Sequence, residues 1–179
     1  MRTSYVFAAL VLVLVGIIVL ARTGLFSRTD PGEPMSRYRR EVMDTPQTPQ
    51  LSTEEAAALA ENYGNATVRP SGLRFIVRTP GTGELTPRRG QEVTAHYEGR
   101  LLRNGRKFDS SYDRHQPITF QVGMGRVIAG WDAILLEMKK GEKRTVIIPW
   151  WLAYGASGRP PAIPPKASLV FDIELIDFK

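Results

Sequence analysis

Regular alternation of apolar and polar side chains constrains the fold of this chain more than any other feature. Residues 93–98 carry Val, Ala and Tyr at every second position, and residues 169–175 carry Leu, Phe, Ile and Leu in the same way. A period of two places these side chains on one face of a strand, with the other face toward solvent. Residues 73–77 and 143–148 predict further strands, as does the alternation of Ile118, Phe120 and Val122.

One hairpin and one helix complete this pattern. Asn104-Gly105 is a strong turn signal between Leu101-Leu102 and Lys107-Phe108 and predicts a β-hairpin over 101–108. A short helix, with Gly141 as its C-cap, is predicted by a stripe at i, i+3, i+4 and i+7: Trp131, Ile134, Leu135 and Met138. Many antiparallel strands with one core-facing helix indicate an α+β domain, a curved antiparallel β-sheet wrapped around one short α-helix.

Composition excludes several classes of site. The chain has no cysteine and two histidines, His96 and His115, which excludes disulfides, thiol nucleophiles and Cys- or His-rich metal clusters. We expect neither a metal nor a cofactor. Residues 73–179 hold 17 Lys/Arg against 11 Asp/Glu and so carry the whole net charge of +6. These basic residues are scattered, without a nucleic-acid-binding motif, so we expect a solvated basic face and no nucleic-acid partner.

The N-terminus is predicted to engage a membrane. Tyr5 to Ala21 is a run of 17 residues without a charge, flanked by Arg2 and Arg22. At about 1.5 Å per residue a helix of this length just crosses a thin hydrocarbon core. The apolar region of a secretory signal is usually shorter, although Val19-Leu20-Ala21 could serve as a cleavage site. Residues 1–22 are therefore a transmembrane anchor or, alternatively, a signal segment.

Residues 23–70 have the composition of a flexible linker that leads to a domain over 71–179. Pro31, Pro34 and Pro46 lie among Gly, Thr, Gln and charged residues, with too few apolar side chains to fold alone. Ser52-Thr53-Glu54-Glu55 is a capping-box pattern before an Ala-rich stretch, which predicts a short helix near 53–63. We expect this helix to be a spacer, with dimerisation as the alternative.

Five short motifs in the C-terminal domain point to a binding site. They place large aromatics, one acid and small residues on separate strands and loops: His96-Tyr97-Glu98-Gly99, Phe108-Asp109-Ser110-Ser111, Val127-Ile128-Ala129-Gly130-Trp131, Ala153-Tyr154-Gly155 and Ile163-Pro164-Pro165. Such a set lines an apolar hollow with sparse polar groups. In their joint occurrence, order and spacing, these motifs resemble the FKBP-type peptidyl-prolyl cis–trans isomerases, the family that binds the macrolides tacrolimus and rapamycin. The resemblance covers residues 71–179.

The resemblance implies a proline pocket with mainly aromatic and aliphatic walls. Its floor would be Trp131, and its lining and rim would be Tyr97, Phe108, Phe171, Val127, Ile128, Ile118 and Ile163. Taken singly, Trp131, Tyr97 and Phe171 would be ordinary core residues, and Asp109 an ordinary turn residue. The joint pattern favours pocket roles for all of them.

The same resemblance implies the polar contacts. The Ile128 N–H would bind one substrate carbonyl and the Tyr154 hydroxyl another, while Asp109 would lie near the twisting amide. Asp109 would be held by Tyr97 and Arg114. The expected catalytic residues are thus Asp109, Tyr154, Trp131, Tyr97 and Phe171, and the remaining pocket residues bind substrate.

The implied activity needs no covalent step. Rotation about an X–Pro bond loses amide resonance, with a barrier of about 20 kcal/mol, and a water-poor pocket favours the twisted amide over the planar one. We expect proline-containing polypeptides as substrates, macrolides as possible ligands and a membrane contact through the N-terminal helix. The alternative is a non-catalytic, membrane-tethered module that binds proline peptides with the same fold.

Four residues depart from the family pattern at the rim. Ile118 stands where an aromatic is frequent, Arg126 where an acid is common, Arg159 where His is frequent, and Ala162 where a branched residue is usual. These departures make the rim more basic and bear on macrolide affinity and peptide preference.

The expected localisation follows from this resemblance and from the positive charges near the apolar N-terminal segment. Bacterial relatives with one apolar N-terminal segment commonly act outside the cytoplasm, which implies an inner-membrane anchor with the domain in the periplasm. The alternatives are a cleaved signal with a soluble periplasmic domain, or a cytoplasm-facing domain. The last is what the positive-inside rule predicts from the arginines after the segment: Arg22, Arg28, Arg37, Arg39 and Arg40.

Overall fold

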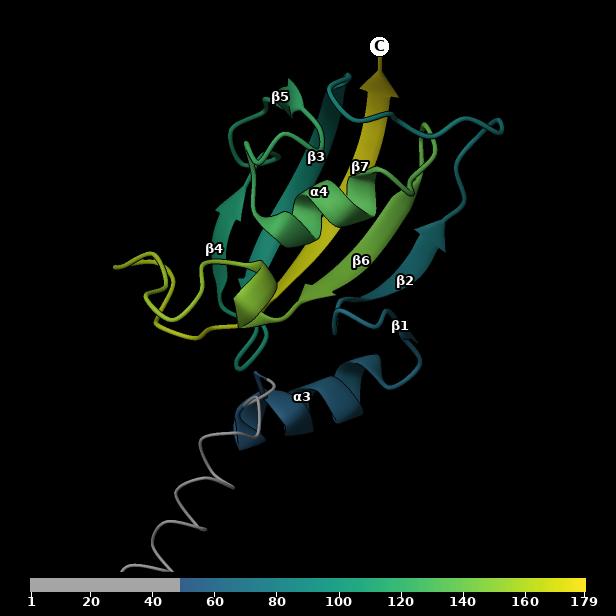
Figure 1. The fold of residues 1–179 in the computed structure, drawn as a ribbon. Helices are drawn as coiled ribbons and strands as arrows, with labels where there is room; N and C mark the ends of the chain where they lie inside the picture. Colours follow the sequence, from purple (N-terminus) through teal and green to yellow (C-terminus); the bar gives the residue numbers. More distant parts are fainter. Residues whose placement is uncertain (1–48) are drawn as a thin grey trace, which may run out of the picture. The chain divides into compact units, whose positions relative to one another are not determined.

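The computed structural model describes residues 49–179 (Figure 1). The predicted N-terminal anchor and the first part of the linker lie outside the described residues. Three helical elements are present in the described part: α3 (Thr53–Tyr63), α4 (Ala129–Leu135) and the 3-10 helix η1 (Trp150–Leu152). No helix within this part combines the length and the apolar character needed to cross a bilayer.

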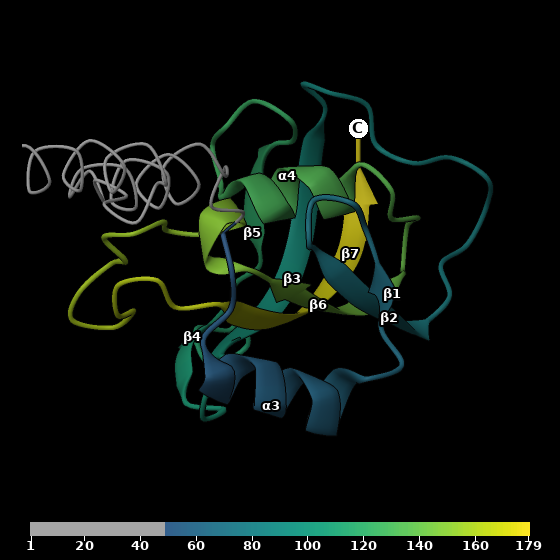
Figure 2. The same cartoon turned by 60° about the horizontal axis from the view of Figure 1, so that its bottom comes forward.

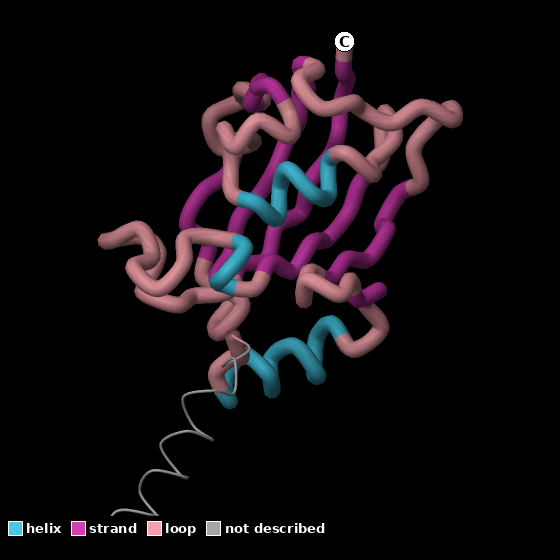
Figure 3. Tube along the Cα trace, in the orientation of Figure 1, coloured by secondary structure: helices cyan, strands magenta, loops and turns pink. Residues whose placement is uncertain are grey.

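Seven antiparallel strands form a single sheet (Figure 3). Their bounds are β1 (Thr67–Val68), β2 (Arg74–Thr79), β3 (Glu92–Leu101), β4 (Lys107–Ser110), β5 (Ile118–Gln121), β6 (Lys143–Ile148) and β7 (Leu169–Phe178). The strand order is β1-β2-β6-β7-β3-β4, and β5 pairs with β3. The last strand, β7, therefore lies between β6 and β3 and pairs with both. The predicted curved antiparallel sheet around one short helix is confirmed.

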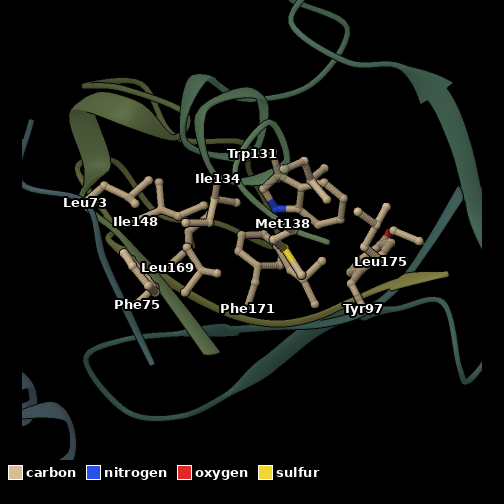
Figure 4. Close-up of a cluster of buried hydrophobic side chains, with 14 of the residues drawn as sticks. Leu73, Phe75, Tyr97, Trp131, Ile134, Met138, Ile148, Leu169, Phe171 and Leu175 are labelled. Carbon is tan, nitrogen blue, oxygen red and sulfur yellow. The ribbon is translucent and has the colours of Figure 1, made fainter. Parts of the chain in front are cut away.

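The main core lies between α4 and the inner face of the sheet (Figure 4). The predicted helical stripe is buried, with Trp131 4% exposed and Met138 fully buried. The helix ends at Leu135, however, with Leu136 as its C-cap. The expected C-cap role of Gly141 is wrong, because the chain leaves the helix earlier and closes a turn in which Glu142 accepts the Lys139 N–H at 2.8 Å. Gly141, with φ 76°, lies in that turn.

The outer face of the sheet is also covered, at one end, by α3 (Figure 2). Ile147 on β6, Val170 on β7 and neighbouring Leu102 pack against Ala58, Leu59, Tyr63 and Ala66. The apolar runs 146–148 and 169–171 are explained by this second layer, since consecutive apolar residues are typical of strands buried on both faces. The predicted helix has the expected bounds, but the compact unit begins at Pro49 rather than at residue 71.

Candidate functional site

A cavity of about 200 Å³ opens beside the start of α4, over the inner face of the sheet. Its lining comes from four strands, α4 and two loops, and consists of Tyr97, Phe108, Asp109, Ile118, Arg126, Val127, Ile128, Trp131, Tyr154, Arg159 and Phe171. Nine of the eleven residues predicted for the site are among them. The two others, Arg114 and Ile163, do not line the cavity. Arg126 and Arg159, predicted only as altered rim residues, do.

The floor and walls form an aromatic box. Trp131 projects from α4 toward Tyr97 on β3 and Phe171 on β7 (Figure 4). The centre of the Trp131 ring lies 5.0 Å from the centre of the Tyr97 ring and 5.3 Å from that of the Phe171 ring, and both of these rings are nearly perpendicular to the indole. Phe108 on β4 stands edge-on to Phe171 at 5.7 Å. Edge-to-face pairs of this kind stabilise one another beyond the burial of their area, so the box has a fixed shape.

Gly99 on β3 makes this packing possible. A Cβ atom at Gly99 would lie 2.7 Å from Phe108 Cζ and 2.7 Å from Phe171 Cε1. Both rings therefore rest on the bare backbone of the strand. Gly99 belongs to the motif His96-Tyr97-Glu98-Gly99, which predicts no separate role for it. A glycine at an inward position of an alternating strand was the available signal, because it marks a close approach to the backbone.

Replacing Gly99 with Ala is expected to displace one of the two rings and narrow the pocket. We expect roughly tenfold lower kcat/KM on a proline peptide and a loss of about 1–3 kcal/mol in the free energy of unfolding, the usual cost of overpacking. Gly64→Ala is the control, because Gly64 is a helix C-cap with φ −60° and lies outside the cavity lining. Equal activities for the two variants would contradict this role of Gly99.

The polar side of the cavity is organised around Asp109 on β4. The Tyr97 hydroxyl donates to Asp109 Oδ2 at 2.5 Å, and the Arg114 guanidinium forms an ion pair with Asp109 Oδ1. Arg114 also donates to the Tyr97 hydroxyl at 2.9 Å. The predicted support of Asp109 by Tyr97 and Arg114 is thus present in the structure, with Arg114 acting from outside the cavity.

These contacts set the protonation of the pair. Burial alone would raise the pKa of Asp109, but hydrogen bonds from Tyr97 and Arg114 and the Arg114 charge hold that pKa below its usual range. Burial and the hydrogen bond to Asp109 raise the pKa of Tyr97. At neutral pH the cavity therefore presents a carboxylate beside a protonated phenol.

Two hydrogen-bonding groups at the mouth are unengaged within residues 49–179. Neither the Ile128 N–H nor the Tyr154 hydroxyl has a partner there. Ile128 is the N-cap of α4, and the loop before it is held by Asp132, which accepts the Gly123 and Gly125 N–H groups at 2.8 Å each. Both groups are therefore available to a bound molecule. Across the same described range, no cluster of three metal-ligating side chains occurs.

Ile163 differs from the expectation. It was predicted at the rim, but its side chain is 3% exposed and belongs to the main core. Its backbone exchanges two hydrogen bonds with Arg159, at 2.8 and 3.0 Å, which fold the segment back on itself. This pairing turns Ile163 inward and leaves Arg159 at the mouth, where its guanidinium lies 5.7 Å from the centre of the Tyr154 ring.

Comparisons with known proteins agree with this geometry. The sequence model of a family described as "FKBP-type peptidyl-prolyl cis-trans isomerase" matches residues 83–176. Peptidyl-prolyl cis-trans isomerase FPR2 of Saccharomyces cerevisiae is 56% identical over 90 residues, which are 50% of this chain and 67% of the yeast protein. FK506-binding protein 1 of Candida glabrata is 47% identical over 105 residues, 59% of this chain and 91% of that protein. The crystal structure of AtFKBP13 matches with a TM-score of 0.60 and 44% identity, over 64% of this chain and 98% of that one.

Proposed function

Because this chain belongs to the FKBP-type peptidyl-prolyl cis–trans isomerase family, we propose that it rotates X–Pro bonds by holding the twisted amide over Trp131. The observation that carries this proposal is the aromatic box, closed on one side by an ionised Asp109. The proline ring would rest on Trp131, with Tyr97 and Phe171 against its faces. Three aromatic rings around the imide bond would keep water away from it.

The proposed catalysis is differential binding. A planar amide is stabilised by charge separation between its oxygen and nitrogen, and this separation is lost when the bond twists. An apolar box therefore penalises the planar form more than the twisted one and lowers the barrier of about 20 kcal/mol. No bond to carbon is made or broken, so a nucleophile is unnecessary.

The polar groups would orient the substrate around the rotating bond. The Ile128 N–H and the Tyr154 hydroxyl would each hold a carbonyl of the peptide, which fixes the chain on one side while the other side turns. Asp109 would interact with the twisting amide itself. Its ion pair with Arg114 keeps the carboxylate oriented without filling the cavity.

A protease-coupled assay with a proline peptide tests the proposed function on the full chain. We expect the cis population to convert faster than the uncatalysed reaction and in proportion to protein concentration. A rate equal to background, together with measurable peptide binding, would favour the alternative of a binding module without turnover. Because the relatives named above include FK506-binding proteins, we also propose macrolide binding, with an affinity altered by Ile118, Arg126 and Arg159.

The basic mouth predicts a preference for acidic substrates. Arg126 and Arg159 are exposed at the cavity and have no acidic partner within residues 49–179. A peptide with Glu beside its proline should have roughly two- to fivefold higher kcat/KM than the matched Lys peptide, since exposed pairs contribute about 0.2–1 kcal/mol. The difference should shrink in high salt and reverse in the double variant Arg126→Glu, Arg159→Glu. Salt-independent rates for the two peptides would contradict it.

We further propose that the N-terminal segment anchors the enzyme at the inner membrane with the domain in the periplasm. The uncharged run Tyr5 to Ala21 supports this proposal, and a cleaved signal or a cytoplasm-facing domain are its alternatives. A phosphatase reporter that functions only outside the cytoplasm, fused after Lys179, should be active. Activity of only a cytoplasmic reporter at the same position would overturn the proposal, and a shortened N-terminus by mass spectrometry would indicate cleavage.

A further inference from the structure

Glu55 is a buried acid that the proposed mechanism does not use. It lies in the first turn of α3, is 3% exposed, and forms no ion pair within residues 49–179. Its two oxygens instead accept from one residue, Ser168: the backbone N–H at 2.7 Å and the hydroxyl at 3.0 Å. Glu55 precedes the family match at 83–176, whereas Ser168 lies within it.

Ser168 also binds Trp150, and these two residues are the ends of a segment that contributes to the cavity mouth. Its hydroxyl donates to Glu55 and accepts the Trp150 N–H at 3.2 Å, so the direction of the chain of hydrogen bonds is fixed. Trp150 and Ser168 are the ends of residues 150–168, here called the flap, which carry Tyr154 and Arg159. A second contact from the same N-terminal region joins the Trp150 indole N–H to the Gln50 carbonyl at 3.1 Å.

Within the flap, backbone hydrogen bonds transmit the position of these ends toward the cavity. The Gly155 N–H donates to the Trp150 carbonyl at 2.9 Å, and the Lys166 N–H donates to the Gly155 carbonyl at 3.2 Å. Tyr154 is thus next to Gly155, which is hydrogen-bonded to one end of the flap, Trp150, and to Lys166, two residues before the other end. A shift of Trp150 or Ser168 would move Tyr154 with it.

A buried carboxylate holds its hydrogen-bond donors in narrowly defined positions. A buried charge is tolerated only when its lone pairs are satisfied, so the Glu55–Ser168 geometry admits little displacement. The apolar packing of Leu59 and Tyr63 on Ile147 and Val170 attaches α3 to the sheet, but such contacts are non-directional. The directional contacts of Glu55 select one position for the flap relative to the sheet.

We propose that Glu55 is a positioning residue for the isomerase reaction, which acts through Ser168 and Trp150 to place the flap and its Tyr154 hydroxyl. The helix α3, which precedes the residues that match the family, then contributes to catalysis and is not a spacer. This inference rests on the proposed role of Tyr154 in substrate binding.

The first test compares Glu55→Ala with Leu59→Ala in the full chain. Both changes weaken the docking of α3, but Leu59 contributes apolar packing against the cluster of Leu102, Ile147 and Val170, whereas Glu55 contributes the hydrogen bonds to Ser168. At a temperature where both variants are folded by circular dichroism, Glu55→Ala should lower kcat/KM by about three- to tenfold, the contribution of a lost hydrogen bond. Leu59→Ala should retain the original value, and Glu55→Gln should be intermediate because its amide oxygen still accepts the Ser168 N–H. Equal kcat/KM for Glu55→Ala and Leu59→Ala would overturn the proposal.

A double-mutant cycle with Tyr154→Phe tests the route. If Glu55 acts through Tyr154, its replacement should cost much less activity once the Tyr154 hydroxyl is absent, whereas strictly additive losses would refute this route. An unchanged kcat/KM for Tyr154→Phe alone would refute the proposed role of Tyr154 and leave the first comparison to decide on Glu55. If the unaltered chain proved inactive, hydrogen exchange of the Trp150 amide would decide: we expect faster exchange in Glu55→Ala than in Leu59→Ala, and equal rates would overturn the proposal.

Discussion

Replacement of Asp109 with Leu is expected to lower kcat/KM on a proline peptide by roughly 10- to 100-fold. The change removes the only carboxylate among the described residues that line the cavity, and it leaves the Tyr97 hydroxyl and the Arg114 guanidinium without their shared acceptor. Hydrogen bonds to a charged group contribute about 1.5–3 kcal/mol, which sets this range. The measurement is a protease-coupled assay of Asp109→Leu against Asp113→Leu. Asp113 is an exposed neighbouring acid that pairs with Lys107 at 2.7 Å and does not line the cavity.

An unchanged rate for Asp109→Leu, or an equal loss in Asp113→Leu, would contradict the role proposed for Asp109. The variant should also bind a macrolide more weakly, because Tyr97 loses the contact that fixes its hydroxyl. Asp109→Asn separates charge from shape: it keeps an acceptor for Tyr97 but removes the ion pair. We expect its activity to lie between those of the unaltered chain and of Asp109→Leu.

The pKa of Asp109 adds a pH signature to this expectation. Because the folded-state pKa is lower than the ordinary value of about 3.9, the ionised form stabilises the folded state above that value. This contribution is lost only as the pH falls through the still lower folded-state pKa. The activity should therefore stay level from pH 8 down to about pH 5. An acid limb centred near pH 6 that disappears in Asp109→Asn would mean that the pKa is raised and would contradict the structure.

Replacement of Trp131 with Ala is expected to have the largest effect on stability and to remove the pocket floor. Trp131 is 4% exposed and contacts Tyr97 and Phe171, so the deletion should cost about 3–5 kcal/mol in the free energy of unfolding. The cavity left behind would also admit water beneath the proline ring. We expect kcat/KM to fall below detection even in the fraction that remains folded.

Met138→Ala is the matched control for this change. Met138 lies two turns along the same buried stripe, is fully buried, and does not line the cavity. Its loss should cost a similar 2–5 kcal/mol, measured by denaturant unfolding, while kcat/KM per folded molecule stays near the original value. If both variants lost activity in proportion to their loss of stability, Trp131 would act only as a core residue, and its role as the pocket floor would be refuted. Trp131→Phe, which keeps an aromatic floor, should recover part of the activity.

Local sequence signals predicted the elements well. The capping-box pattern at Ser52 predicted where α3 begins, and the Ser52 hydroxyl accepts the Glu55 N–H at 3.2 Å, while the Glu55 carboxylate accepts from Ser168 instead of closing the box. Alternation predicted β3, which buries one regular face along its whole length, and the part of β7 after Phe171, where buried and half-buried residues alternate. Nine of the predicted pocket residues line the cavity. They could be predicted together because the resemblance implies the whole set and not single residues.

The failures concern contacts between residues far apart in the chain. Nothing near Glu55 reveals that its carboxylate binds Ser168, 113 residues later, so the sequence predicts only a spacer or a dimerisation helix there. The rim position predicted for Ile163 is wrong because the direction of its side chain depends on backbone pairing with Arg159, which no periodicity encodes. One non-local signal was present and unused: the apolar triplets at 146–148 and 169–171 require a cover on the outer face of the sheet.

The central place of β7 links activity to completion of the fold. This strand pairs with β3 on one side and β6 on the other, and it carries Phe171, a wall of the cavity. Both neighbours precede it in the chain, so a folding intermediate without β7 would have two open strand edges and no pocket. Long-range pairing of this kind is slow to form compared with local contacts. Catalytic turnover should therefore appear in refolding experiments with the kinetics of the final sheet closure, and earlier compact states should be inert.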